Sequence, residues 1–183
     1  LINNAALNPK MESEINAEVT RLENYSVENW NKEIAVGITG AFICSKIIGP
    51  IMAKQRKGII VNISSDLGNI APDQRIYYQD GLDENKQPVK PVSYSVVKHG
   101  IIGLTKYLAT YWAHKGVRVN ALCPGGVEQK QDPDFIQKLT NLIPLGRMAK
   151  PDEYKSAIQF LCSDASSYMN GACLIMDGGR SCW

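Results

Sequence analysis

The sequence predicts an α/β fold in which a parallel β-sheet is covered by helices. Short apolar runs rich in β-branched residues occupy positions 58–64 and 117–123, as in strands buried on both faces of a parallel sheet. Between these runs lie long segments whose apolar residues recur three and four positions apart, the spacing of one helix face. The expected order is β-α-β-α-β-α-β, which predicts one domain over residues 1–183 with parallel strands.

The first expected elements are the end of a strand and a long helix. Residues 1–6 have the pattern of a buried strand that runs into a loop, and the polar residues 9–26 predict a surface loop or a short helix. A helix is expected over 27–57, with an apolar face formed by Trp30, Ile34, Ile38, Ala41, Phe42, Ser45, Ile48 and Met52. Gly37 and Gly40 lie inside this helix, where each costs up to about 1 kcal/mol relative to Ala, so they predict close packing or a kink.

The alternation continues after Gly58. A strand over 58–64 is followed by residues 69–91, whose prolines and polar run predict an inserted loop. A helix is expected over 93–115, with an apolar face of Val97, Ile101, Leu104, Leu108 and Tyr111, and Gly116 supplies its stop.

The last third holds two further strands. The strand over 117–123 ends at Pro124, and residues 129–142 are polar and then moderately helical. Pro151 with the acidic residues after it favours a helix start at Lys150, with Tyr154, Ala157, Ile158 and Leu161 pointing inward. A final strand is expected over 172–176.

Several polar or glycine-rich segments follow the expected strands. Ligands of such sheets bind beyond the carboxyl ends of the strands. Four segments are expected there: Asn3 to Ala6, Ser64 with Ser65, Pro124 to Gly126, and Asp177 to Gly179. The helix that begins near Ser93 starts at the same edge, so this edge is the expected binding site.

Tyr94 and Lys98 are the candidate catalytic pair at that edge. They are four positions apart and share one face of the expected helix. An ammonium near a phenol favours the phenolate and lowers a pKa that is ordinarily about 10, which suits proton transfer. The spacing alone also occurs in helices with a solvated Lys and a Tyr at the edge of the core. The surrounding segments at the sheet edge favour the functional interpretation.

Composition limits the classes of partner. The hydrophobic content of 44% and charged content of 21% are those of a soluble globular protein. The net charge of +2 comes from 20 basic and 18 acidic residues without a single-sign block, which argues against nucleic acid and membrane surfaces. No apolar run of about 18 residues and no signal-peptide pattern is found, so we expect a cytoplasmic protein that binds small molecules and other subunits.

The five cysteines are the remaining candidates for special chemistry. They form no Cys-x-x-Cys pair, and no His is spaced to complete a zinc site. We therefore expect no metal, and thiols that are reduced and packed.

The motifs together resemble those of the classical short-chain dehydrogenase/reductase family. The matching segments are Asn3-Asn4-Ala5, Val61 to Ser65 with Gly68, Tyr94 to Lys98, Asn120 to Gly125, and Phe160 to Asp164 with Gly171 and Asp177-Gly178-Gly179. The resemblance covers nearly the whole chain except residues 70–91. It implies a Rossmann-like three-layer α/β/α fold that here lacks the first strands, and an NAD(P)-dependent oxidoreductase acting between an alcohol and a carbonyl.

The resemblance also assigns roles to individual residues. Tyr94 is implied as the general acid/base, Lys98 as the group that lowers the phenol pKa and holds the nicotinamide ribose, and Ser65 as the hydrogen-bond partner of the reacting oxygen. Ser64 is expected to face the sheet. Cofactor contacts are implied for Asn4, Tyr94, Lys98, Pro124, Gly125, Gly126 and Val127, with Asn3 bracing the strand ends. The cofactor is NAD or NADP, and family members are commonly homotetramers or dimers.

Three departures from the family pattern change what is expected. The Gly-rich turn and the residue that selects the cofactor precede Asn3 in the family and are absent here, so we expect a truncated chain without the information that separates NAD from NADP. Gly37 stands where many members carry an Asn that completes a catalytic tetrad. Ser65 and Tyr94 are 29 positions apart, compared with about a dozen in the family, which implies an insertion of roughly fifteen residues.

The insertion bears on the substrate. Together with Gly37, it resembles members found with surface-polysaccharide and flagellin-glycan modification, which implies a sugar-type substrate. Candidates to meet a polar or anionic substrate are Arg75, Tyr77, Tyr78 and Lys86, and ordinary loop surface or subunit contact explains them equally well.

Two other functions remain open at this point. A non-catalytic assembly subunit would keep the fold without turnover, which Gly37 and the absent N-terminal part favour and the intact Ser65, Tyr94 and Lys98 oppose. An epimerase or dehydratase with bound NAD would hold its cofactor tightly without net redox.

Overall fold

The computed structural model describes residues 1–7 and 19–183 and confirms the α/β class. Its strands form one parallel sheet in the order β1-β2-β3-β4. They are β1 (Ile2–Asn3), β2 (Gly58–Ile63), β3 (Val117–Pro124) and β4 (Cys173–Met176). The region predicted as a surface loop or short helix lies partly outside the described residues, and its described part includes a 3₁₀ turn at Leu22–Asn24.

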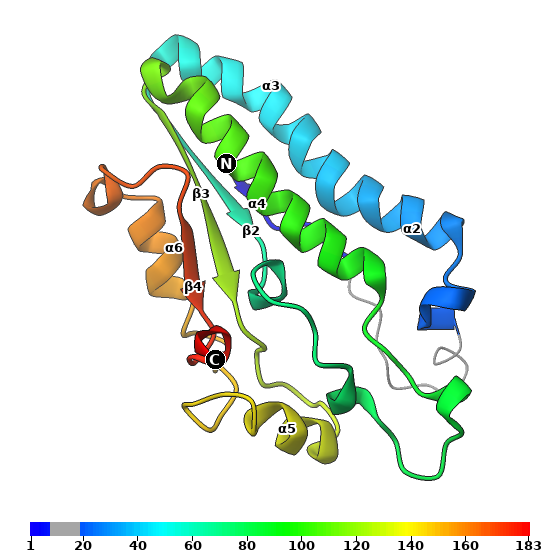
Figure 1. The fold of residues 1–183 in the computed structure, drawn as a ribbon. Coiled ribbons are helices and arrows are strands. Elements are labelled where there is room, and N and C mark those ends of the chain that lie inside the picture. The colour runs from blue at the N-terminus through cyan, green and yellow to red at the C-terminus, as the bar shows by residue number, and fades with distance from the viewer. Residues whose placement is uncertain (8–18) are drawn as a thin grey trace.

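Helices cover both faces of this sheet, as a three-layer arrangement requires. Figure 1 shows α3 (Gly40–Gln55) and α4 (Val92–Trp112) side by side along one face, with α6 (Lys155–Leu161) on the other. Successive side chains of a strand point to opposite faces. Ile60 and Val119 therefore join Leu108 and Trp112 in one core, whereas Val61 and Leu122 join Ala157 and Leu161 in the other.

The long first helix is interrupted at its glycine. α2 (Val27–Ile34) is capped by the Ser26 hydroxyl, which accepts a hydrogen bond from the Asn29 amide, and a π-helical turn over Ala35–Thr39 joins it to α3. Gly37 is the buried residue of that turn. A Cβ on Gly37 would lie 2.4 Å from Cγ1 of Val97 on α4, so the missing side chain permits the close approach of the two helices. The close packing that the sequence predicts is confirmed at Gly37.

The apolar faces predicted for the two long helices include residues that the structure leaves exposed. Phe42 on α3 is 47% exposed and Tyr111 on α4 is 57% exposed, whereas the core position is taken by Trp112. Gly116 ends the helical region in the left-handed conformation with φ of 72°, as predicted. The helix expected from Lys150 begins at Lys155 instead, because the preceding residues form turns.

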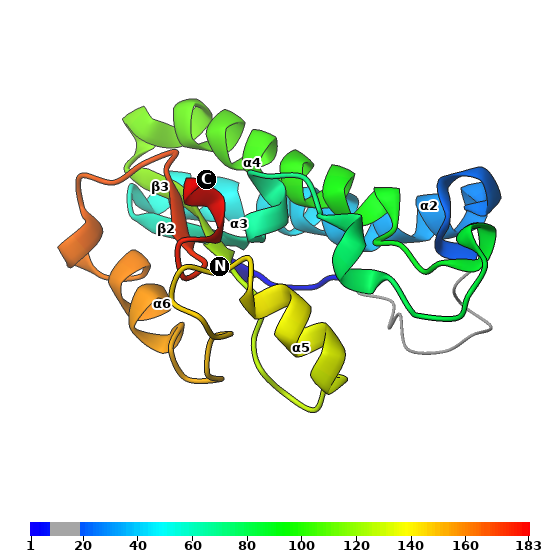
Figure 2. The same ribbon diagram turned by 60° about the horizontal axis from the view of Figure 1, so that its bottom comes forward.

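The inserted segment is packed rather than bulging freely. It contains short 3₁₀ turns at Gln74–Tyr77 and Glu84–Lys86 and meets α5 (Pro133–Thr140). Their shared apolar cluster is built on Ile76, Leu139, Ile143 and Met148. Figure 1 shows α5 and this segment beyond the carboxyl ends of the strands, and Figure 2 gives a second view of α5.

A buried polar chain ties the strands to α4. The Asn3 amide donates to Oδ1 of Asn62 at 2.8 Å and to the Ser45 hydroxyl at 3.2 Å, and the Asn62 amide donates to the Thr105 hydroxyl at 2.8 Å. Asn62 and Thr105 are fully buried, where unpaired polar groups are costly. The predicted bracing role of Asn3 is confirmed.

The combined helix Val27–Gln55 is long and apolar enough to cross a membrane by length and composition alone. This corrects the expectation that no apolar stretch reaches that length, since Lys46 is the only charge between Ile34 and Ala53. In the fold this helix packs against β2 and α4, so a core role explains part of its apolarity.

Candidate active site

Ser65, Tyr94 and Lys98 come together at the carboxyl end of β2. Ser65 follows β2 after one residue, and Tyr94 and Lys98 lie on successive turns at the start of α4. The Lys98 ammonium donates to the Ile63 carbonyl at 3.1 Å and lies 5.6 Å from the centre of the Tyr94 ring. The structure thus brings the three predicted catalytic residues to one place.

Gly68 explains how the serine turn approaches α4. A Cβ at Gly68 would lie 2.4 Å from the Ser64 hydroxyl and 2.9 Å from the Lys98 carbonyl oxygen. The Ser64 hydroxyl donates to that carbonyl at 2.8 Å, so Ser64 faces α4. The prediction that Ser64 faces the sheet is therefore wrong. The neighbouring Ser65 is left to face the Tyr94 hydroxyl, whose pKa it influences by hydrogen bonding.

Burial dominates the electrostatics of the pair. It raises the pKa of Tyr94, the Ser65 hydroxyl opposes this rise, and the charge of Asp66 adds to it. Burial also lowers the pKa of Lys98. The expectation that Lys98 holds the phenol pKa below its ordinary value is therefore wrong for this arrangement, because desolvation disfavours the charged form of both groups.

Lys90 is a site residue that the sequence did not reveal. Its ammonium lies 3.9 Å from the centre of the Tyr94 ring. Burial lowers the pKa of Lys90 to about 8, with the charges of Glu33 and Asp66 opposing the shift. The feature of the sequence that could have indicated this role is its position, four residues before Tyr94, where the insertion joins the helix.

The insertion residues named from sequence divide into two groups, and Tyr77 lies within electrostatic reach of Tyr94, Asp66 and Arg180. Arg75 and Lys86 pair with Asp73 and Asp83 and are largely exposed. The Tyr77 ring packs on Phe135 at 5.6 Å.

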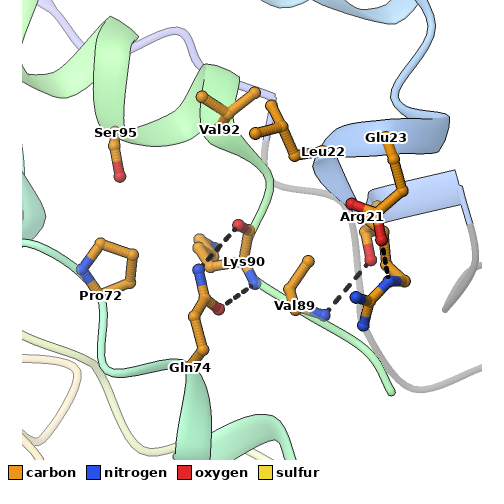
Figure 3. A pocket seen from close by; sticks show the side chains of 10 residues that line it. Arg21, Leu22, Glu23, Pro72, Gln74, Val89, Lys90, Val92 and Ser95 are labelled. Carbon is orange, nitrogen blue, oxygen red and sulfur yellow. Dashed lines mark hydrogen bonds and ion pairs between the residues drawn. The ribbon is translucent and has the colours of Figure 1, made fainter. Parts of the chain in front are cut away.

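An open pocket of about 360 Å³ adjoins Lys90 (Figure 3). The Gln74 side chain fixes its wall by accepting from the Lys90 amide at 2.8 Å and donating to the Lys90 carbonyl at 3.4 Å. Its lining residues are Thr20, Arg21, Leu22, Glu23, Pro72, Gln74, Val89, Lys90, Val92 and Ser95. The lining mixes polar with apolar groups and includes none of Ser65, Tyr94 and Lys98, and Lys90, whose ammonium lies over the Tyr94 ring, connects the pocket to the site.

The predicted cofactor segments share the same sheet edge. Asn4 is exposed directly after β1, and Pro124 ends β3. The Gly125 amide donates to the Met176 carbonyl at 2.9 Å, and the Gly126 carbonyl accepts from the Ala149 amide at 3.0 Å.

The donor set at this edge fits a nicotinamide nucleotide. The Lys98 ammonium has three N–H groups, and the Ile63 carbonyl takes one of them. The others suit ribose hydroxyls. Val127 pairs with Ala149 just beyond Gly126, which holds the backbone of this turn at the edge.

The cysteines carry no disulfide. All five thiols are free, but Cys44, Cys162 and Cys182 are exposed, so the expectation of packed thiols is wrong for these three. Burial raises the pKa of the Cys123 thiol to about 11, which keeps it neutral. Among residues 1–7 and 19–183, no group of three or more His, Cys, Asp or Glu side chains is placed to hold a metal.

Two family models match the chain. One, described as short chain dehydrogenase, matches residues 1–79, and one described as Enoyl-(Acyl carrier protein) reductase matches residues 84–181. The D-threitol dehydrogenase of Mycolicibacterium smegmatis is 35% identical over 168 residues, covering 89% of this chain and 58% of the relative. A galactitol 2-dehydrogenase (L-tagatose-forming) of Cereibacter sphaeroides is 34% identical over 160 residues, covering 84% and 58%.

Solved structures show the same likeness. A short chain dehydrogenase from Leptospira borgpetersenii with bound NAD+ superimposes with a TM-score of 0.85 at 35% identity, covering 99% of this chain and 64% of that one. A gluconate 5-dehydrogenase from Burkholderia cenocepacia in complex with NADP and tartrate gives 0.83 at 26% identity, covering 100% and 64%. The chain therefore spans about three fifths of the length of these proteins.

Proposed function

The chain belongs to the short-chain dehydrogenase/reductase family, and from this membership we propose that it is an NAD(P)-dependent oxidoreductase that interconverts an alcohol and a carbonyl. The observation that carries the proposal is the meeting of Ser65, Tyr94 and Lys98 at the carboxyl edge of the sheet. We assign residues 1–183 to one domain, the catalytic and nicotinamide-binding half of such an enzyme.

The proposed chemistry follows from the three side chains. Bound nicotinamide supplies the hydride to the carbonyl carbon or accepts it from the alcohol carbon. Tyr94 donates its phenol proton to the carbonyl oxygen in reduction and accepts the hydroxyl proton in oxidation. The Ser65 hydroxyl, which donates to Asp66 here, can accept from a substrate alcohol as it stands and turns its proton to a substrate carbonyl oxygen in reduction. The Lys98 ammonium is assigned to the nicotinamide ribose, because burial keeps the pKa of Tyr94 above its ordinary value.

The cofactor is proposed to lie along the carboxyl edge. Asn4, Tyr94 and Lys98 would contact the ribose, and the backbone of Pro124, Gly125, Gly126 and Val127 the carboxamide. The solved relatives bind NAD+ in one case and NADP in the other, and either fits the residues present.

A polyhydroxylated, sugar-type substrate is the proposed class. D-threitol and galactitol dehydrogenases are among the relatives, although 3-oxoacyl reductases such as that of Thermotoga maritima, 37% identical over 171 residues, are too. The polar groups of Gln74, Lys90 and Ser95 at the pocket suit hydroxyl-rich ligands. This fits the proposed subgroup of surface-glycan and flagellin-glycan modifying enzymes.

A homo-oligomer, tetrameric or dimeric, is proposed from the outer helix face, and a cytoplasmic location is proposed from membership of the family. α3 and α4 expose several large apolar side chains there, and such patches mark contact surfaces. They are Phe42, Ile43, Ile47, Ile51, Tyr107 and Tyr111.

The test is turnover by the full-length protein with NADH or NADPH and a panel of ketoses and other carbonyls. Tyr94→Phe should lose at least about a hundredfold in kcat, the low end of what a general acid contributes. Tyr168→Phe is the matched control, since Tyr168 is fully exposed and should change nothing. Equal rates for Tyr94→Phe and wild type would remove the acid/base assignment. Tightly bound cofactor that is not consumed would favour an epimerase or dehydratase. A protein that neither binds nor consumes cofactor would favour an assembly subunit.

A further inference from the structure

A buried ion pair lies directly behind the candidate serine. Asp66 and Arg180 are 4% and 8% exposed in their side chains, and the Arg180 Nη1 donates to Asp66 Oδ2 at 2.8 Å. The other carboxylate oxygen, Oδ1, accepts from the Ser65 hydroxyl and from the Leu67 amide, both at 2.8 Å. Asp66 therefore joins Ser65 to a residue 114 positions further along the chain.

The arginine is itself held in place. It follows the turn after β4, where Asp177 accepts from the Gly179 amide at 2.9 Å and from the Ser181 amide at 2.8 Å. Gly178 and Gly179 adopt φ of 69° and 90°, conformations that suit glycine. This hydrogen-bonded turn therefore holds the Arg180 guanidinium in position.

The charge of Asp66 bears on the proposed reaction. Ionised groups are expensive to bury, and a buried pair adds little net stability over apolar side chains of the same size. An uncompensated carboxylate beside Tyr94 would disfavour the phenolate that carbonyl reduction leaves behind, because like charges repel. Arg180 supplies the compensating charge while leaving Asp66 able to orient the Ser65 hydroxyl.

We propose that Asp66 and Arg180 are positioning residues of the active site: Asp66 fixes the Ser65 hydroxyl beside Tyr94, and Arg180 neutralises the carboxylate that does so. The proposal rests on the function proposed above. Neither residue touches the reacting atoms. A purely structural clamp between the serine turn and the C-terminal turn is the competing explanation.

The decisive readout is the titration of residue 94, which does not depend on turnover. The full-length protein is made with 3,5-difluorotyrosine in place of Tyr94, and its phenol is titrated by fluorine NMR. Arg180→Met should move this titration to higher pH, because it leaves Asp66 unpaired. The double variant Asp66→Asn with Arg180→Met should return it to or below the wild-type position. The double variant also keeps the test open where the single one fails to fold, since removing both charges avoids a lone buried carboxylate.

The matched control is Arg147→Met. Arg147 pairs with Glu153 at 2.7 Å, but that pair is partly exposed, so the titration at position 94 should not move. An unmoved titration in Arg180→Met and in the double variant would overturn the proposal and leave the structural clamp.

Kinetics supply the second readout. Arg180→Met should lower kcat for carbonyl reduction at least about tenfold with a smaller change in KM, since misplaced catalytic groups affect the chemical step. Asp66→Asn with Arg180→Met should recover part of that loss, because the Asn oxygen can still accept from Ser65. Unchanged kcat in an active Arg180→Met enzyme would contradict the proposal. An inactive wild type would refute the proposed function, while the titration would still decide the positioning role.

Discussion

Replacing Gly37 by alanine tests the helix packing on which the site depends. The new Cβ would lie 2.4 Å from Cγ1 of Val97. Carbon atoms pack at about 3.5–4.0 Å, so the overlap exceeds 1 Å. Val97 is buried and β-branched, which leaves it essentially one rotamer in a helix, and it cannot turn away. The two helices must therefore move apart next to Lys98.

Two opposing effects set the size of the change. Alanine is favoured over glycine inside a helix by up to about 1 kcal/mol. Overpacking a well-packed contact costs about 1–3 kcal/mol, and the stiffness of Val97 favours the upper part of that range. We expect Gly37→Ala to lower the free energy of unfolding by about 1–2 kcal/mol.

The assay is denaturant unfolding of the full-length protein with Gly40→Ala as the matched control. Gly40 begins α3, and a Cβ there would meet only the Ala35 carbonyl oxygen at 3.6 Å, an ordinary contact. Gly40→Ala should therefore gain about 0.5–1 kcal/mol. Adding Val97→Ala should remove the clash, with a coupling of about 1–3 kcal/mol between the two positions. If Gly37→Ala proved as stable as Gly40→Ala, the packing argument would be refuted.

Three further results follow from the site. Burial raises the pKa of Tyr94, and alcohol oxidation needs the phenolate, so its rate should increase as pH rises above neutrality. Carbonyl reduction needs the neutral phenol and should be fastest at lower pH. Matching pH profiles for the two directions would contradict this. Gly68→Ala should cost about 1–3 kcal/mol and most of the activity, since its Cβ meets the Lys98 carbonyl; wild-type melting and turnover would disprove the contact. Ile47→Asp on the exposed face of α3 should dissociate the oligomer in light scattering, and an unchanged mass would move the interface elsewhere.

The parallel sheet and the meeting of Ser65, Tyr94 and Lys98 could be predicted from the sequence. The β-branched runs at β2 and β3 and the glycine after α4 predicted elements that the structure confirms. Tyr94 and Lys98 could be paired because a helix places i and i+4 on one face, and Ser65 could be added because parallel strands end at one edge. These are local or topological regularities that one sequence contains.

The contacts made across the fold could not be predicted in this way. Arg180 meets Asp66 only because β4 and β2 end at the same edge, and no spacing links the two positions. Lys90 lies over Tyr94 because the insertion folds back on α5, which depends on burial of Ile76. Phe42 and Tyr111 belong to the predicted apolar helix faces but are exposed, because apolar periodicity cannot distinguish a core face from an exposed contact face.

The central claim is that Ser65 and Tyr94 act on one oxygen as a unit. The most direct measurement is kcat/KM for carbonyl reduction by wild type, Ser65→Ala, Tyr94→Phe and the double variant. When two groups act as a unit, removing either one abolishes their joint contribution to the rate. The double variant should therefore be no slower than the worse single variant. Losses that multiply would contradict the account, because they would mean that the two hydroxyls contribute independently.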